Sequence, residues 1–176
     1  MNVPMNSTLR VAQLLCLLQR VDGRKKFHKL VHILQEFDCP FSEQFDYSYY
    51  GMYSRELRSE VETLVQEKLV RETPSPNQAG EHTYIFESTS DLEVFLHGLG
   101  IGKKPAWEQL ATQLNSLHTQ MLEGISTILF LRRRGLEAGE LKTRFLALKP
   151  HLADIYAQCE QEAKKLKSPK ARLVEA

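Results

Sequence analysis

Residues 69–86, LVRETPSPNQAGEHTYIF, change the hydrophobic pattern of the chain and decide the predicted fold. Before them apolar residues recur at helical spacing, whereas residues 82–86 alternate as a half-buried strand does. The middle of the stretch is rich in proline, asparagine and glycine, which favour turns. Residues 69–73 and 82–86 are therefore predicted to form the two strands of a β-hairpin.

Three amphipathic helices are predicted before this hairpin, because apolar side chains recur every three or four positions over residues 8–21, 24–37 and 54–68. Gly23 is expected to end the first helix. Ser54 is expected to cap the third, since a serine oxygen can accept a hydrogen bond from a free amide at a helix start. Residues 38–53 lack helical spacing and are predicted to form a packed aromatic loop.

These elements predict a mainly α protein with a small β-hairpin, in which residues 1–96 form a winged-helix-like region. A helical region over residues 106–167 follows, beginning with one long helix over residues 106–134. The two regions could equally form one fused domain. The tail, residues 168–176, is expected to be disordered.

Composition excludes several classes of protein. The chain has 176 residues, with 23 Lys+Arg against 22 Asp+Glu and 42% hydrophobic residues, as in an average globular domain. The sequence shows no secretory signal and no apolar run of the roughly 20 residues that cross a bilayer. Its three cysteines lack CxxC spacing, which favours reduced thiols over disulfides or a zinc site. We therefore expect a cytoplasmic protein that does not span a membrane.

Four basic residues are candidates for contacts with nucleic acid. Arg55, Arg58 and Lys68 lie on the third predicted helix and Arg71 lies on the hairpin, where a winged helix would meet phosphates or base edges. Glutamates are interspersed among them, and carboxylates repel phosphate unless they face away or pair within the protein. The pattern therefore predicts weak or assisted DNA binding.

A second basic segment, Arg132 to Arg134, ends the long predicted helix. Cations at this position are favoured by the helix macrodipole, which is sufficient to explain them. With the lysines of the C-terminal segment they could instead form a basic patch for RNA or an acidic partner.

Tyr50, Gly51, Tyr53 and Ser54 are predicted to have a structural role at the start of the third helix. Gly51 is expected to allow a positive φ or a close approach of another group. Because a tyrosine ring offers a flat apolar face and a hydroxyl, the tyrosines could instead stack on bases or hold a peptide.

A metal site and an enzyme active site are less favoured. His28, His32 and Glu36 recur every four residues and could approach one ion. Without an HExxH pattern or a cysteine partner, we interpret them as surface polar residues beside the core stripe. The sequence contains no phosphate-binding loop, nucleophile elbow or dinucleotide fingerprint. We therefore expect no enzymatic activity, no metal and no cofactor, and the sequence identifies no small-molecule substrate.

Three segments of the chain resemble one family. KFHKLVHIL at 26–34, FDYSYYGMYSREL at 45–57 and MLEGISTILFL at 121–131 are similar, in order and spacing, to motifs of the YwgA-like proteins and the related phage-associated Panacea antitoxin proteins. The resemblance covers most of residues 8–165. It implies a small prokaryotic cytosolic protein of winged-helix-like build, and it implies no enzymatic reaction.

The leading functional hypothesis is a noncatalytic, winged-helix-like protein that contacts DNA through Arg55, Arg58 and the residue 69–86 hairpin. The alternative is an adaptor, an antitoxin-like partner protein or a homodimer. The mixed charge of the third predicted helix and the long apolar helix over residues 106–134 motivate this alternative.

Overall fold

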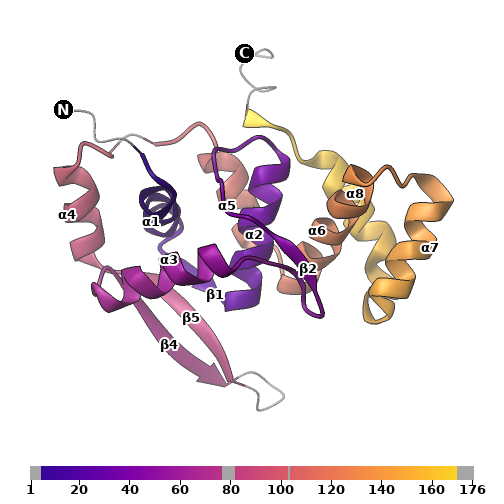
Figure 1. The fold of residues 1–176 in the computed structure, drawn as a ribbon, viewed down its shortest axis with the longest axis horizontal. Coiled ribbons are helices and arrows are strands. Elements are labelled where there is room, and N and C mark those ends of the chain that lie inside the picture. Colours follow the sequence, from indigo (N-terminus) through magenta and orange to yellow (C-terminus); the bar gives the residue numbers. More distant parts are fainter. Residues whose placement is uncertain (1–4, 77–81, 103, 170–176) are drawn as a thin grey trace.

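Helix α2, Arg24–Glu36, lies at the centre of the molecule and contacts α5, α6, β1, β3 and β5 (Figure 1). The structure is a computed structural model that describes residues 5–76, 82–102 and 104–169. Residues 26–34 of α2 are all buried, so this helix has no solvent face along those turns. Its polar side chains must therefore find partners inside the protein.

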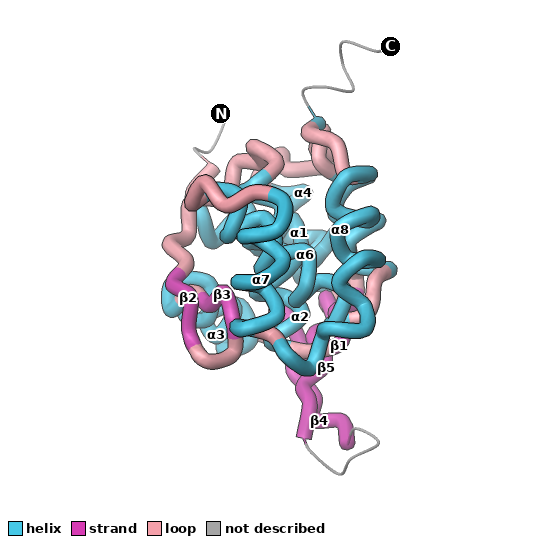
Figure 2. The backbone as a smooth tube through the Cα atoms, turned by 90° about the vertical axis from the view of Figure 1, so that its right-hand side faces the viewer, coloured by secondary structure: helices cyan, strands magenta, loops and turns pink. Residues whose placement is uncertain are grey.

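The elements before and after α2 follow the predicted order of three helices and a hairpin. They are α1 (Ser7–Leu18), β1 (Arg20–Asp22), α2, α3 (Arg55–Gln66), β4 (Val70–Pro76) and β5 (His82–Ser88). β5 pairs antiparallel with both β4 and β1, which gives the sheet order β1-β5-β4. The predicted hairpin is confirmed for its strands, and residues 77–81 of its turn lie outside the described residues. Figure 2 shows β4 and β5 extending away from the helices.

The first predicted helix is too long at its C-terminal end. α1 ends at Leu18, Gln19 has a positive φ of 62°, and Arg20–Asp22 form β1. Val21 is 1% exposed and lies opposite Phe86 in the sheet, so its burial follows the alternation of a strand. Gly23, with a φ of 124°, precedes the first residue of α2 instead of ending α1.

The segment 38–53 contains regular structure that its sequence did not indicate. β2 (Asp46–Ser48) and β3 (Gly51–Tyr53) form a short antiparallel hairpin with Tyr49 and Tyr50 at its tip. Cys39 and Phe41 are buried in the core, so the earlier part of the segment is packed as expected.

The C-terminal half contains α4 (Ser90–Gly98), α5 (Glu108–Ser116), α6 (Thr119–Arg133), α7 (Ala138–Leu148), the 3-10 helix η1 (Pro150–Ile155) and α8 (Tyr156–Lys165). The single helix predicted over residues 106–134 is wrong. Leu117 and His118 adopt extended ψ angles of 149° and 151°, which separate α5 from α6. The break lets α5 contact α1 and α2 while α6 contacts α2, α7 and α8.

One continuous hydrophobic cluster joins the two halves of the described chain, from Val11 of α1 to Leu166 after α8. Within the described residues, no helix has the length and apolar character needed to cross a membrane. Of the tail that we predicted to be disordered, residues 170–176 lie outside the described part of the chain.

Gly124 of α6 provides a test of this packing, because α8 lies directly against it. A methyl group added at Gly124 would overlap Cys159 Sγ and lie 3.1 Å from Cys159 Cβ. Gly124→Ala is therefore expected to lower the free energy of unfolding by about 1–3 kcal/mol, the usual cost of overpacking, in urea denaturation. Gly139→Ala in α7 is the control, since nothing lies within 4 Å of its added methyl group. Equal effects of the two substitutions would contradict the close approach.

Candidate functional site

The buried ammonium group of Lys29 holds the β2–β3 hairpin against α2. Lys29 Nζ donates hydrogen bonds to the carbonyl oxygens of Tyr50, at 2.8 Å, and Met52, at 2.9 Å. Between them Gly51 has a φ of 84°, and a Cβ there would lie 3.3 Å from Lys149 Nζ and 3.5 Å from Lys29 Cε. The predicted positive φ and close approach at Gly51 are both confirmed.

His28 fixes the junction between this hairpin and α3. Its Nδ1 accepts a hydrogen bond from the Ser54 amide at 3.1 Å, and the Tyr53 ring stacks on its imidazole with centroids 4.6 Å apart. Ser54 Oγ accepts from the Leu57 amide, which confirms the predicted cap. Burial, reinforced by the positive charges of Lys29 and Arg58, lowers the pKa of His28 to about 4. The neutral ring is the form that can accept the Ser54 hydrogen bond.

The next turn of α2 uses a similar arrangement to hold α6. His32 Nδ1 lies 2.8 Å from Ser126 Oγ, and His32 Nε2 lies 3.5 Å from Glu36, which accepts from Arg133 at 2.8 Å. Our interpretation of His28 and His32 as surface residues is therefore wrong, since both are buried. Their neighbours supply interior hydrogen-bond partners that sequence spacing does not reveal. Within the described residues, no group of three potential ligands could hold a metal ion.

The three segments that carry the family resemblance meet around α2. The contacts of Lys29 and His28 join residues 26–34 to 45–57, and the contact of His32 with Ser126 joins 26–34 to 121–131. Tyr47 and Phe130 complete the set, with stacked rings whose centroids are 4.8 Å apart. Residues far apart in sequence thus form one polar and aromatic network.

A cavity of about 640 Å³ lies between the start of α2, α3 and the β4–β5 hairpin, and we call it the α3 groove. Val61, Val65 and Phe86 contribute apolar surface to it. At its edge, the Arg24 guanidinium lies 3.7 Å from the centre of the Tyr84 ring and also pairs with Glu72. These contacts connect α2 to both strands of the hairpin.

The four predicted nucleic-acid contacts are all exposed, and two of them, Arg55 and Arg58, lie one turn apart on α3. Arg58 alone of the four lines the α3 groove, where it pairs with Glu62 at 2.7 Å. Arg55 is exposed in the first turn of α3 and has no ion-pair partner among the described residues. Lys68 follows α3 with a φ of 60°, and Arg71 lies on β4.

The basic segment at the end of α6 is largely engaged within the protein. Arg133 pairs with Glu36 at 2.8 Å, and Arg132 lies 3.9 Å from Glu160 of α8. The Arg134 guanidinium lies 5.3 Å from the centre of the Phe130 ring. These contacts add a structural role to the favourable position of the arginines at the helix end.

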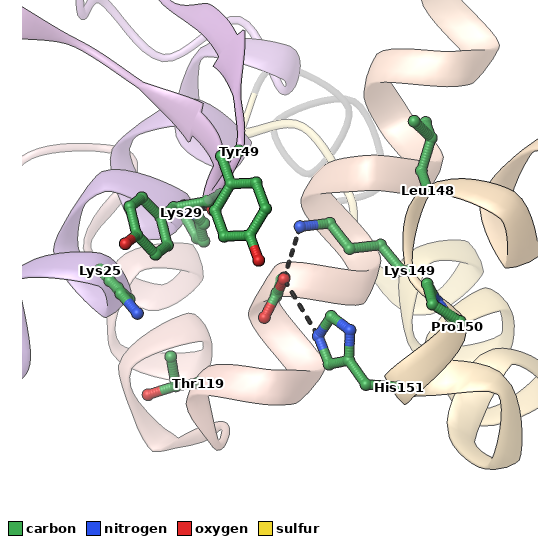
Figure 3. Close-up of a pocket in the computed structure, with 10 residues that line it drawn as sticks. Lys25, Lys29, Tyr49, Thr119, Leu148, Lys149, Pro150 and His151 are labelled. Carbon is green, nitrogen blue, oxygen red and sulfur yellow. Dashed lines mark hydrogen bonds and ion pairs between the residues drawn. The ribbon is translucent and has the colours of Figure 1, made fainter. Parts of the chain in front are cut away.

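A second cavity, of about 380 Å³, adjoins the groove and shares Lys25, Lys29, Tyr50 and Thr119 with it. We call it the lysine cavity. Figure 3 shows Lys25, Lys29, Lys149 and His151 around the same space. Sequence reasoning missed this site because its residues come from α2, the β2–β3 tip, α6 and η1. The sequence held one signal of this site. Several lysines lie in the first turns of α2, where the positive end of the helix macrodipole disfavours basic side chains.

The charged groups of the lysine cavity lie close together and are partly buried. Lys149, which is 2% exposed, donates to Glu123 Oε1 at 2.6 Å, and His151 Nε2 lies 3.4 Å from the same oxygen. Burial lowers the pKa of Lys29 to about 8; Glu123 opposes this shift, while Lys149 and Lys25 reinforce it.

Comparison with known proteins supports the resemblance to the YwgA-like proteins, and it does not show the link to the Panacea proteins. The chain is 31% identical over 127 residues to the uncharacterized protein YwgA of Bacillus subtilis (strain 168), an alignment that covers 72% of this chain and 74% of YwgA. The chain belongs to the YwgA family. No family model matches it, and no solved structure matches it. Because that relative is uncharacterised, family membership brings no activity with it.

Two features of Gly51 favour glycine: its positive φ and the lysine side chains close to it. Gly135 has only the first feature and therefore serves as a comparison. Both have a positive φ, but nothing lies within 4 Å of a Cβ at Gly135. Gly135→Ala is expected to cost about 1–2 kcal/mol of unfolding free energy for the backbone alone. Gly51→Ala should cost more, because the Lys149 ammonium, 3.3 Å from the added methyl group, must also give way, and a β-branched residue should cost more still. Thermal denaturation measures both, and a smaller loss at Gly51 would contradict this account.

His28 should make stability depend on pH. Its pKa is about 4 in the folded protein against about 6.5 in the unfolded chain, so only the unfolded chain binds the proton between these values. The free energy of unfolding should therefore fall by about 2–3 kcal/mol as pH falls from 6.5 to 4. His28→Gln should reduce this dependence, measured by urea denaturation at several pH values. The control His97→Gln, on the exposed face of α4, should retain it.

Proposed function

We propose that this protein is a noncatalytic, winged-helix-like module that binds duplex DNA. The observation that carries the proposal is the element order α1-β1-α2-β2-β3-α3-β4-β5, in which the strand between the first two helices pairs with the β4–β5 hairpin and the short β2–β3 hairpin is inserted between α2 and α3. In a winged helix of this order the third helix is the one presented to the major groove, and the hairpin flanks it. α3 and the β4–β5 hairpin would have these roles.

The charges of α3 are compatible with a weak contact to phosphate. Arg55 and Arg58 are exposed on its N-terminal half. Two of the glutamates that would oppose phosphate have partners within the protein, because Glu62 pairs with Arg58 and Glu56 accepts from the Gln44 amide at 2.9 Å. Their repulsion of a duplex is reduced accordingly.

The chemistry of the cysteines supports a noncatalytic role. Burial raises the pKa of Cys39 to about 12 and that of Cys159 to about 11, and it also raises the pKa of Cys16. The thiolate is the nucleophilic form of cysteine, so burial disfavours it at all three positions.

A protein partner is the second candidate function, as an adaptor or antitoxin-like protein. Its support is α4, on which Val94 is 71% exposed and Phe95 41% exposed. These two adjacent side chains offer apolar surface that a partner could cover. The predicted long helix no longer supports this candidate, because α5 and α6 are separate.

Fluorescence anisotropy of a labelled random duplex at about 50 and 200 mM salt tests the DNA proposal. The protein should bind at low salt and release the duplex at high salt. Arg55→Ala/Arg58→Ala should weaken binding and reduce the slope of log K against log salt by about 2, since two phosphate contacts are removed.

The matched control is Lys142→Ala/Arg144→Ala, which removes the same charge from exposed positions of α7. It should bind as the unmodified protein does. Equal losses in the two double variants would mean that net charge alone attracts the duplex. Absence of binding at low salt would reject the DNA proposal and favour a protein partner.

A further inference from the structure

The lysine cavity contains more positive than negative charge. Lys25, Lys29 and Lys149 line it, and Glu123 is the only acidic residue among its lining residues. With the lysines charged, three positive charges face one carboxylate, so the cavity has a net charge of about +2. Glu123 accepts a hydrogen bond from Lys149, and one carboxylate cannot balance three ammonium groups.

The ammonium groups of the lysine cavity repel one another because they are held close together. A Cβ on Gly51 would lie within 3.6 Å of both Lys29 Nζ and Lys149 Nζ, so the two ammonium groups converge on the same point. Both side chains are almost fully buried, where charges are screened less than at the surface. The lowered pKa of Lys29 reflects burial first and then the repulsion by Lys149 and Lys25. An anion in the cavity would relieve this repulsion.

The position of the backbone adds to the attraction for an anion. Thr119 is the first residue of α6 and lines the cavity, and Lys25 is in the first turn of α2. Neither helix start has a side-chain cap hydrogen bond. The partial positive charge of both helix starts is therefore directed toward the side of the molecule on which the lysines lie.

The size and rim of the cavity limit the ligand. A volume of about 380 Å³ is at the lower end of small-molecule sites. Tyr49, 92% exposed, and Tyr50, 58% exposed, stand at its edge with their rings in edge contact, centroids 5.1 Å apart. The Lys25 ammonium lies 4.4 Å from the centre of the Tyr50 ring. Charged groups would hold the anionic end of a ligand, and the tyrosines would contact whatever is attached to it.

We propose that the lysine cavity binds a phosphate group carried by a small molecule. A phosphate monoester has a charge of about −1.5 to −2 at pH 7, which matches the excess charge of the cavity. It also offers three oxygens to the converging ammonium groups. The recessed position of Lys29 and Lys149 favours a small ligand over the backbone of a duplex. This site is separate from the DNA contacts proposed for Arg55 and Arg58 and does not depend on them.

Isothermal titration calorimetry with inorganic phosphate and adenosine 5′-monophosphate tests the proposal, with adenosine and chloride of equal ionic strength as negative controls. Lys25→Ala should weaken the affinity for phosphate probes about tenfold, since a hydrogen bond to a charged group is lost. Lys25 is exposed and its contact with the Tyr50 ring is at the surface, so this variant should fold normally. Tighter binding of the nucleotide would identify an ester, and equal binding would identify free phosphate.

Glu123→Gln is expected to change the affinity for phosphate in the opposite direction to Lys25→Ala. The amide oxygen can still accept from Lys149, but the competing negative charge is removed, so phosphate should bind more tightly than to the unmodified protein. Lys142→Ala on α7 is the matched control and should leave the affinity unchanged. Absence of heat with both phosphate probes at millimolar concentration would reject the site. So would equal affinities in Lys25→Ala, Glu123→Gln and the unmodified protein.

Discussion

The complete burial of residues 26–34 in α2 is the constraint on which the rest of the structure depends. A helix buried on all sides is usually apolar, yet this one carries Lys26, His28, Lys29 and His32 into the interior. Each must be satisfied there, because an unpaired buried polar group costs roughly 1–3 kcal/mol. The partners are the Asn115 carbonyl for Lys26, the Ser54 amide for His28, two hairpin carbonyls for Lys29 and Ser126 for His32.

These partners account for the position of the other elements. Lys29 needs two carbonyl oxygens, which the positive φ of Gly51 turns toward it, and this places the β2–β3 hairpin. The same hairpin leads directly into Ser54, whose amide meets His28, so the start of α3 is fixed by α2 as well. The segments 26–34, 45–57 and 121–131, on which the family resemblance rests, are therefore joined by contacts in the interior of the protein.

The two cavities follow from the same arrangement. Both form where the first turns of α2 meet other elements, and they share Lys25 and Lys29. In the α3 groove both arginines are paired with carboxylates, Arg58 with Glu62 and Arg24 with Glu72. In the lysine cavity a single carboxylate, Glu123, faces three lysines, so most of the positive charge has no acidic partner among the lining residues.

The sequence by itself determined the elements whose signals are local: α2 by its apolar stripe, α3 by the Ser54 cap, the β4–β5 hairpin by alternation, and the need for glycine at position 51. Only the tertiary structure decided the rest. β1 has three residues and exists because β5 pairs with it, and the break at Leu117 lets α5 and α6 pack on different neighbours. The burial of His28 and the approach of Lys29 to Lys149 depend on segments up to 120 residues apart in the sequence. Helical spacing shows which residues share one face of a helix, but it does not show which other segment covers that face.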